Sequence, residues 1–230
     1  MTWNPPTGLD EFLNPTELCD CENPKITKTA KKVTEGASTP REAAQKIFLY
    51  VRDEVLFGLD NFDLKASETL NRGYGQCVNK ANLQIALLRS IDIPARYHRV
   101  VLTKDCLKGI VPNITFNSIP ERIWWHPYCE VYLEEKWTSC ETLFDKRLYE
   151  AAIKENIISQ DQIPSIDWDG ASDLTQVSHW ILEDGGTHSN QDEIFKRAQR
   201  EALPPKFIAN IFLRHSYRYT DKLREKGSNK

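Results

Sequence analysis

Two periods of hydrophobic spacing alternate along this chain, and each predicts a different kind of element. Apolar residues recur at helical spacing in 39–55 and in 77–90, so one face of each segment is expected to be buried. Thr39 and Pro40 suit the start of the first of these helices, as cap and first residue. Spacing and composition predict further helices at 25–34, 66–70, 147–156, 191–203 and 206–224.

The period changes to that of β-structure in the middle of the chain. Residues 95–102 and 128–133 read as strands, and a shorter strand is expected at 137–142 after the polar turn 134–136. The segment 157–190 has no clear period and predicts irregular structure. Helices followed by a small antiparallel sheet and then by more helices indicate an α+β fold.

Composition narrows the class of protein. Forty per cent of the 230 residues are hydrophobic, which is enough to form a core, and the formal net charge is only −3. The sequence has no basic run, which argues against a nucleic-acid partner or a membrane surface. With neither a secretory signal nor an apolar run of about 20 residues, we expect a cytoplasmic protein whose six cysteines are reduced. The oligomeric state is left open.

We expect one domain over residues 1–230. It comprises an N-terminal arm and helix (1–38), a core (39–145) and a mostly helical C-terminal extension (146–230).

The first candidate for chemistry is Cys77, at the predicted start of a helix. Unpaired N–H groups and a partial positive charge at a helix N-terminus favour a thiolate. Gly75 lets a substrate carbonyl approach the backbone, and the Cys77 N–H can donate to an oxyanion there. The alternative is that Cys77 is simply a small buried hydrophobe.

His126 is the candidate base. It follows Trp125 at the expected opening of a strand, and the hairpin should bring Glu141 beside it to orient the imidazole. Asp145, four residues further on, is the rival carboxylate, but the register of the hairpin favours Glu141. The alternative is a histidine that only packs among tryptophans.

Four segments together resemble the transglutaminase-like superfamily. Residues 74–77 (YGQC) resemble its cysteine motif, and 88–96 resemble the LR…GIPxR signature that follows it. Residues 126–133 (HPYCEVYL) resemble the histidine strand, and 137–141 (WTSCE) resemble the element that carries the acid. Each segment is weak alone, but all four occur in the family's order and spacing, within a likeness that covers 39–145.

The resemblance implies a papain-like transglutaminase core with Cys77, His126 and Glu141 as a catalytic triad. A Cys77 thioester would form from a peptide, a protein or a small amide, and water would resolve it, as in a cysteine protease or amidase. An amine in place of water would give an acyltransferase or a biosynthetic amide-forming enzyme. A domain that only binds peptides or partners is the alternative from another class.

The chain departs from the family pattern at several positions. The acid is Glu141 where the family usually has Asp, and Asp92 replaces a glycine at a position that we expect to need a positive φ. The family's tryptophan before the cysteine has no clear counterpart, so Gln76, Gly75 and Trp125 are candidates for the oxyanion site or the cleft. No second pair of ligands accompanies Cys19 and Cys21, so neither a metal site nor an obligatory cofactor is expected.

Overall fold

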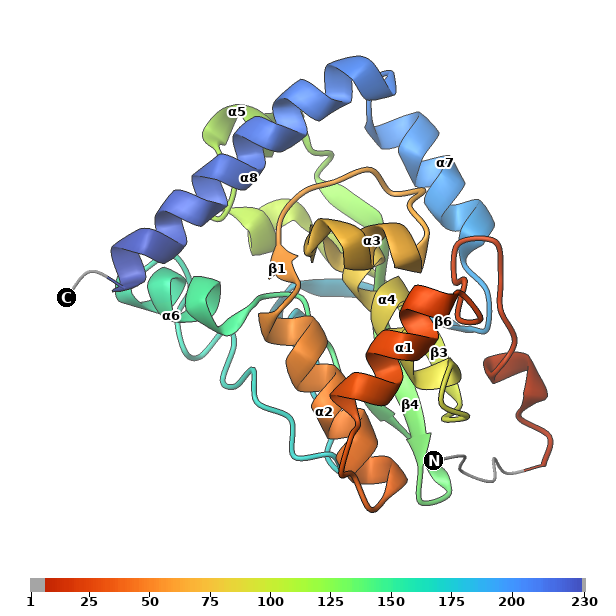
Figure 1. The fold of residues 1–230 in the computed structure, drawn as a ribbon. Helices are drawn as coiled ribbons and strands as arrows, with labels where there is room; N and C mark the ends of the chain where they lie inside the picture. The colour runs from red at the N-terminus through yellow and green to blue at the C-terminus, as the bar shows by residue number, and fades with distance from the viewer. Residues whose placement is uncertain (1–6, 229–230) are drawn as a thin grey trace.

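An antiparallel sheet with a buried helix against it forms the centre of the fold (Figure 1). The computed structural model describes residues 7–228. Its α-helices are α1 (Pro24–Val33), α2 (Pro40–Asp53), α3 (Ala66–Arg72), α4 (Cys77–Arg89), α5 (Asn113–Ser118), α6 (Lys146–Lys154), α7 (Asp192–Ala202) and α8 (Lys206–Ser228). Its strands are β1 (Leu56–Phe57), β2 (Tyr74–Gly75), β3 (Ala95–Thr103), β4 (Arg122–Leu133), β5 (Lys136–Ser139) and β6 (Ile181–His188). Short 3-10 helices lie at Asp10–Phe12, Lys104–Leu107 and Ser178–Trp180.

The main sheet has four strands in the order β5-β4-β3-β6, so the prediction of three strands was incomplete. The missing strand, β6, lies within the segment 157–190 that was expected to be irregular. It is an edge strand with mostly partly exposed residues, and Gly185 and Gly186 interrupt its register against β3. Half-exposed, glycine-containing edge strands lack the regular apolar alternation that identifies a strand from sequence.

The helix α4 is buried on all sides. Every residue from Val78 to Arg89 is buried, whereas the pattern predicted only one buried face. It packs between β3 and β4 on one side and the helices α1, α2 and α3 on the other. Its neighbour Asp92 has φ 62°, as expected for the position where the family has glycine.

A two-stranded parallel ribbon fixes the start of α4. Leu56 of β1 pairs with Tyr74 of β2, and the Gly58 N–H donates to the Gly75 carbonyl at 3.1 Å. Because β2 ends two residues before Cys77, this ribbon determines where the first turn of α4 lies.

The C-terminal helices enclose the core from one side. In Figure 1, α8 runs the length of one edge of the molecule and meets α7 at a corner, while its far end lies beside α6. Within residues 7–228, none of the helices combines the length and the apolar composition that crossing a bilayer would require.

Candidate active site

Cys77 is the first residue of α4 and the only one of the six cysteines with a partly exposed side chain. Gln76 precedes it as the N-cap, and the Gln76 N–H donates to Asn79 Oδ1 at 3.1 Å. Gly75 is required here because a Cβ at that position would lie 2.6 Å from Asn79 Cβ. The thiol thus lies at the positive end of a 13-residue helix, where a thiolate is stabilised.

His126 lies within β4 rather than at its opening, because the pairing of β4 with β3 extends back to Arg122. The ring is buried, and its Nε2 lies 2.8 Å from Glu141 Oε1. This contact occupies Nε2, so Nδ1 is the ring nitrogen left to interact with the Cys77 side chain, which helps to raise the pKa of His126. The structure therefore brings together Cys77, His126 and Glu141.

Both carboxylate oxygens of Glu141 have partners within the protein. While Oε1 contacts His126, Oε2 accepts from the Val177 N–H at 3.1 Å. Its backbone is fixed as well, since its N–H donates to the Leu174 carbonyl at 3.0 Å and its carbonyl accepts from Gln176 Nε2 at 3.0 Å. Sequence reasoning did not find the segment 174–177, because nothing in its pattern indicates that it folds back on Glu141.

The electrostatics of the site favour a charged imidazole. Burial alone would lower the pKa of His126, but attraction and hydrogen bonding to Cys77, and then to Glu141, outweigh it and raise the pKa to about 10. By contrast, burial raises the pKa of the Cys19 thiol to about 12 and also raises that of Cys106. The charged imidazole of His126 therefore lies beside the Cys77 side chain, whereas burial disfavours the thiolate forms of Cys19 and Cys106.

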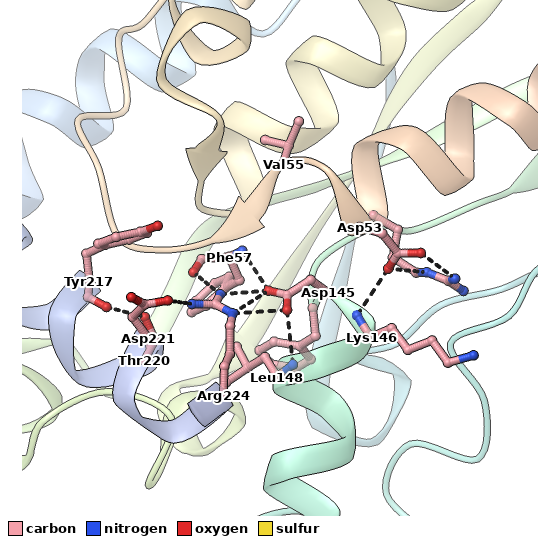
Figure 2. A network of polar contacts seen from close by, with 12 residues as sticks. Asp53, Val55, Phe57, Asp145, Lys146, Leu148, Tyr217, Thr220, Asp221 and Arg224 are labelled. Atoms are coloured by element: carbon pink, nitrogen blue, oxygen red, sulfur yellow. Dashed lines mark hydrogen bonds and ion pairs between the residues drawn. The ribbon is translucent and has the colours of Figure 1, made fainter. Parts of the chain in front are cut away.

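Asp145, the rival acid, is engaged elsewhere. It caps α6 by accepting from the Leu148 N–H at 3.0 Å, and it accepts from the Phe57 N–H at 2.9 Å. Its main partner is Arg224 of α8, whose Nη2 lies 2.7 Å from Asp145 Oδ2 (Figure 2). Both side chains of this ion pair are buried, and Arg224 is the largest cause that lowers the pKa of Asp145 against the effect of burial.

The other residues singled out from the sequence occupy different parts of the cleft. Gln76 Nε2 donates to the backbone carbonyl of Asp60, which commits the side-chain amide to the fold. Trp125 is buried and packs edge-on against Phe62, with ring centroids 5.3 Å apart. The backbone N–H groups of the first turn of α4, that of Cys77 included, are then the best-placed candidates for an oxyanion site.

A cavity of about 370 Å³ opens beside Cys77. Cys77, Gln76, His126 and Trp125 line it, together with Phe57 of β1 and Leu59 just after this strand. The opposite wall comes from α5 and the start of β4, and from Leu203 and α8 in the C-terminal region. Among residues 7–228, no group of three His, Cys, Asp or Glu side chains is arranged to hold a metal ion.

Comparison with known protein families gives a match. A family model described as the transglutaminase-like superfamily matches residues 27–142, just over half of the chain. No curated protein matches the chain.

Among solved structures, a candidate cysteine protease from Cytophaga hutchinsonii is similar at a TM-score of 0.50 and 20% identity. The match covers 81% of this chain and 49% of that one, so this chain spans about half the length of that relative. Red sea bream transglutaminase matches at a TM-score of 0.35 and 17% identity, over 58% of this chain and 26% of that one. The expected α+β fold with a papain-like transglutaminase core is confirmed, and the chain belongs to the transglutaminase-like superfamily.

Proposed function

We propose that this protein is a cysteine hydrolase, a protease or amidase, in which Cys77, His126 and Glu141 act as the catalytic triad. The observation that carries the proposal is the buried imidazole of His126, which lies between the Cys77 side chain and the Glu141 carboxylate and has a pKa raised to about 10. A histidine held in this way is charged at neutral pH and can supply a proton to a leaving group.

In the acylation step, the Cys77 thiolate attacks the carbonyl carbon of an amide, and the oxyanion forms near the N-terminus of α4. The C–N bond then breaks as His126 gives its Nδ1 proton to the leaving nitrogen. The product of this step is an acyl thioester on Sγ together with a free amine.

In the second step, neutral His126 takes a proton from water while the water oxygen bonds to the carbonyl carbon. The C–S bond breaks, a carboxylic acid leaves, and the thiolate–imidazolium pair is restored. An amine that replaced water would make the same site an acyltransferase, and a peptide, a protein or a small amide would serve as acyl donor. Location in the cytoplasm stays a prediction.

The test is alkylation by iodoacetamide at mildly acidic pH, with mass spectrometry of all six cysteines. We expect Cys77 to react about 10²-fold faster than an ordinary thiol, because a thiolate is already present at a pH where free cysteine is protonated. The variant His126→Ala should lose this advantage. The control His98→Ala, which removes a histidine on the neighbouring strand β3, should keep it.

If Cys77 reacts no faster than the buried cysteines, or if His126→Ala keeps the advantage, the catalytic proposal is wrong and a binding module becomes the better interpretation. If Cys77 reacts fast, amide substrates with and without added amines then separate hydrolysis from acyl transfer by the mass of the product.

A further inference from the structure

The cavity beside Cys77 has walls that are largely apolar. Besides Cys77, His126 and Cys106, whose buried thiol has a raised pKa, the ionisable residue among those that line it is Asp60. Both carboxylate oxygens of Asp60 lie 2.6 Å from Arg72 Nη1, so a partner within the protein already neutralises this charge. No lysine or arginine is among the described residues that line the cavity.

This lining discriminates between classes of acyl group. A charged group that entered the cavity would lose its hydration and meet no free counter-charge, which is costly. An uncharged apolar group would instead bury its surface against apolar walls, which is favourable in proportion to the area removed from water. The cavity volume of about 370 Å³ is within the range of pockets that bind small organic groups.

The mouth of the cavity exposes large apolar side chains. Phe212 of α8 is 50% exposed and Ile114 of α5 is 64% exposed, and both are among the lining residues. On the same wall, Ala209 and Leu213 of α8 are buried. A bound apolar group would cover part of the exposed surface at the mouth, which adds to its affinity.

The wall that α8 provides is held in a fixed position. Arg224 Nη2 donates to the Phe57 carbonyl at 2.6 Å as well as to Asp145, and Phe57 itself lines the cavity (Figure 2). About two helical turns earlier in α8, Tyr217 packs on Tyr74 with ring centroids 4.4 Å apart. The residue next to the Tyr217 ring has to be a glycine, Gly58, since a Cβ at this position would lie 2.5 Å from the ring.

The acyl group is the part of the substrate that this cavity should hold. The leaving group departs after His126 protonates it, whereas the acyl group stays bonded to Sγ until the thioester is resolved. The space next to Sγ therefore has to accommodate the acyl group throughout the reaction.

Resting on the proposed function, we propose that the acyl donor carries a bulky, uncharged, apolar group, aliphatic or aromatic, beside the carbonyl that Cys77 attacks. Phe212 and Leu213 of α8 are the residues that select for it. In a peptide substrate this group is the side chain of the residue that supplies the carbonyl.

A series of p-nitrophenyl esters with one leaving group and different acyl groups tests this specificity. Acetyl, butanoyl, hexanoyl and phenylpropanoyl esters vary the apolar size, and succinyl adds a negative charge at the size of butanoyl. We expect kcat/KM to rise by about fourfold for each added methylene until the cavity is filled, since burying one CH₂ is worth about 0.8 kcal/mol. The succinyl ester should react at least about tenfold more slowly than the butanoyl ester.

Variants of α8 test the assignment of the wall. Phe212→Ala should reduce the ratio of the phenylpropanoyl rate to the acetyl rate, and Phe212→Arg should raise the ratio of succinyl to butanoyl. A gain on the succinyl ester cannot result from unfolding. Ile211→Ala is the matched control, because Ile211 is 69% exposed on the same helix and does not line the cavity.

Each outcome has one meaning. Rates that do not depend on the acyl group, or Phe212 variants that behave like Ile211→Ala, would overturn the specificity while rapid alkylation of Cys77 would leave the proposed function standing. If alkylation of Cys77 is also slow, the proposed function itself is wrong.

Discussion

The side chain of Glu141 uses both of its carboxylate oxygens, one on His126 and the other on the Val177 N–H. The extra methylene, relative to an aspartate, is accommodated because Val177 supplies a backbone donor at the far side of the carboxylate. The residue is also buried, so its carboxyl oxygens find their hydrogen-bond partners in the protein and not in water. These contacts leave the imidazole of His126 little freedom to rotate.

Replacing this carboxylate by an amide should impair catalysis and move its pH dependence. Contacts with Glu141 help to raise the pKa of His126 to about 10, so the imidazolium is lost only as the pH rises through that value. In Glu141→Gln we expect kcat/KM to fall by about 10²-fold or more. The alkaline limit of the pH profile should shift to lower pH, because the pKa of His126 is then raised by Cys77 alone and no longer by the Glu141 carboxylate.

Asp145→Asn is the comparison for this prediction, with kcat/KM measured as a function of pH at a temperature where both variants are folded. Its alkaline limit should stay at the wild-type value, because Asp145 contacts Arg224 and α6 and does not contact His126. Equal shifts in the two variants would show that Glu141 is not the acid that orients the histidine.

At this scale, the sequence predicted which side chains lie together better than it predicted the contacts that hold them. Cys77 and His126 stand in motifs with a recognisable order, and hairpin register was enough to favour Glu141 over Asp145. The contacts that hold Glu141 in place could not be predicted, because Val177 is 36 residues away and contributes only a backbone N–H. Any residue type can supply such a group, so the sequence contains no signal for it.

Among the elements, the longer helices were predictable because their ends are encoded locally, whereas the six-residue helix α5 was not predicted. Thr39 accepts a hydrogen bond from the Glu42 N–H at 3.1 Å at the start of α2, as the capping pattern indicated. Strands depend more on distant partners. The strand β4 begins earlier than predicted because Arg122 and Ile123 pair with the end of β3. The strand β6 was missed because it lies at the edge of the sheet and pairs only with β3.

The position of α8 depends on one buried ion pair, and this leads to a prediction about stability. In Arg224→Met the carboxylate of Asp145 remains buried without its main cation, so the free energy of unfolding should fall by about 3–5 kcal/mol. Denaturant titration followed by circular dichroism measures the change. The control Arg218→Met, at an exposed position of the same helix, should change the free energy by less than about 0.5 kcal/mol. A similar small loss in both variants would mean that α8 is held by other contacts.

Across the whole molecule, the buried lysine of α4 connects stability to pH. Lys80 Nζ donates to the backbone carbonyls of Arg52 and Val55, and burial lowers its pKa to about 7, against the attraction of Asp145. The unfolded chain retains this proton up to a pKa of 10.5, so folding releases a proton between these two values. Raising the pH through that range should therefore stabilise the fold, while below it the cost of the buried charge is constant.

Lys80→Met removes this dependence. We expect the free energy of unfolding of the wild type, measured in urea at several pH values, to rise relative to that of Lys80→Met between about pH 7 and pH 10. Lys146→Met, a change at an exposed position, should follow the wild type. Parallel curves for wild type and Lys80→Met would mean that the lysine keeps its ordinary pKa in the fold.

The wall that α8 adds to the cavity lies outside the stretch 27–142 that matches the family. Cys77 and His126 are encoded within that stretch, and the surface proposed to choose the acyl group is encoded more than 60 residues later. Mutations in the two parts of the gene can therefore be selected separately. On the proposed specificity, a lineage can acquire a new substrate by single changes in α8, and none of the intermediate proteins has to lose Cys77 or His126.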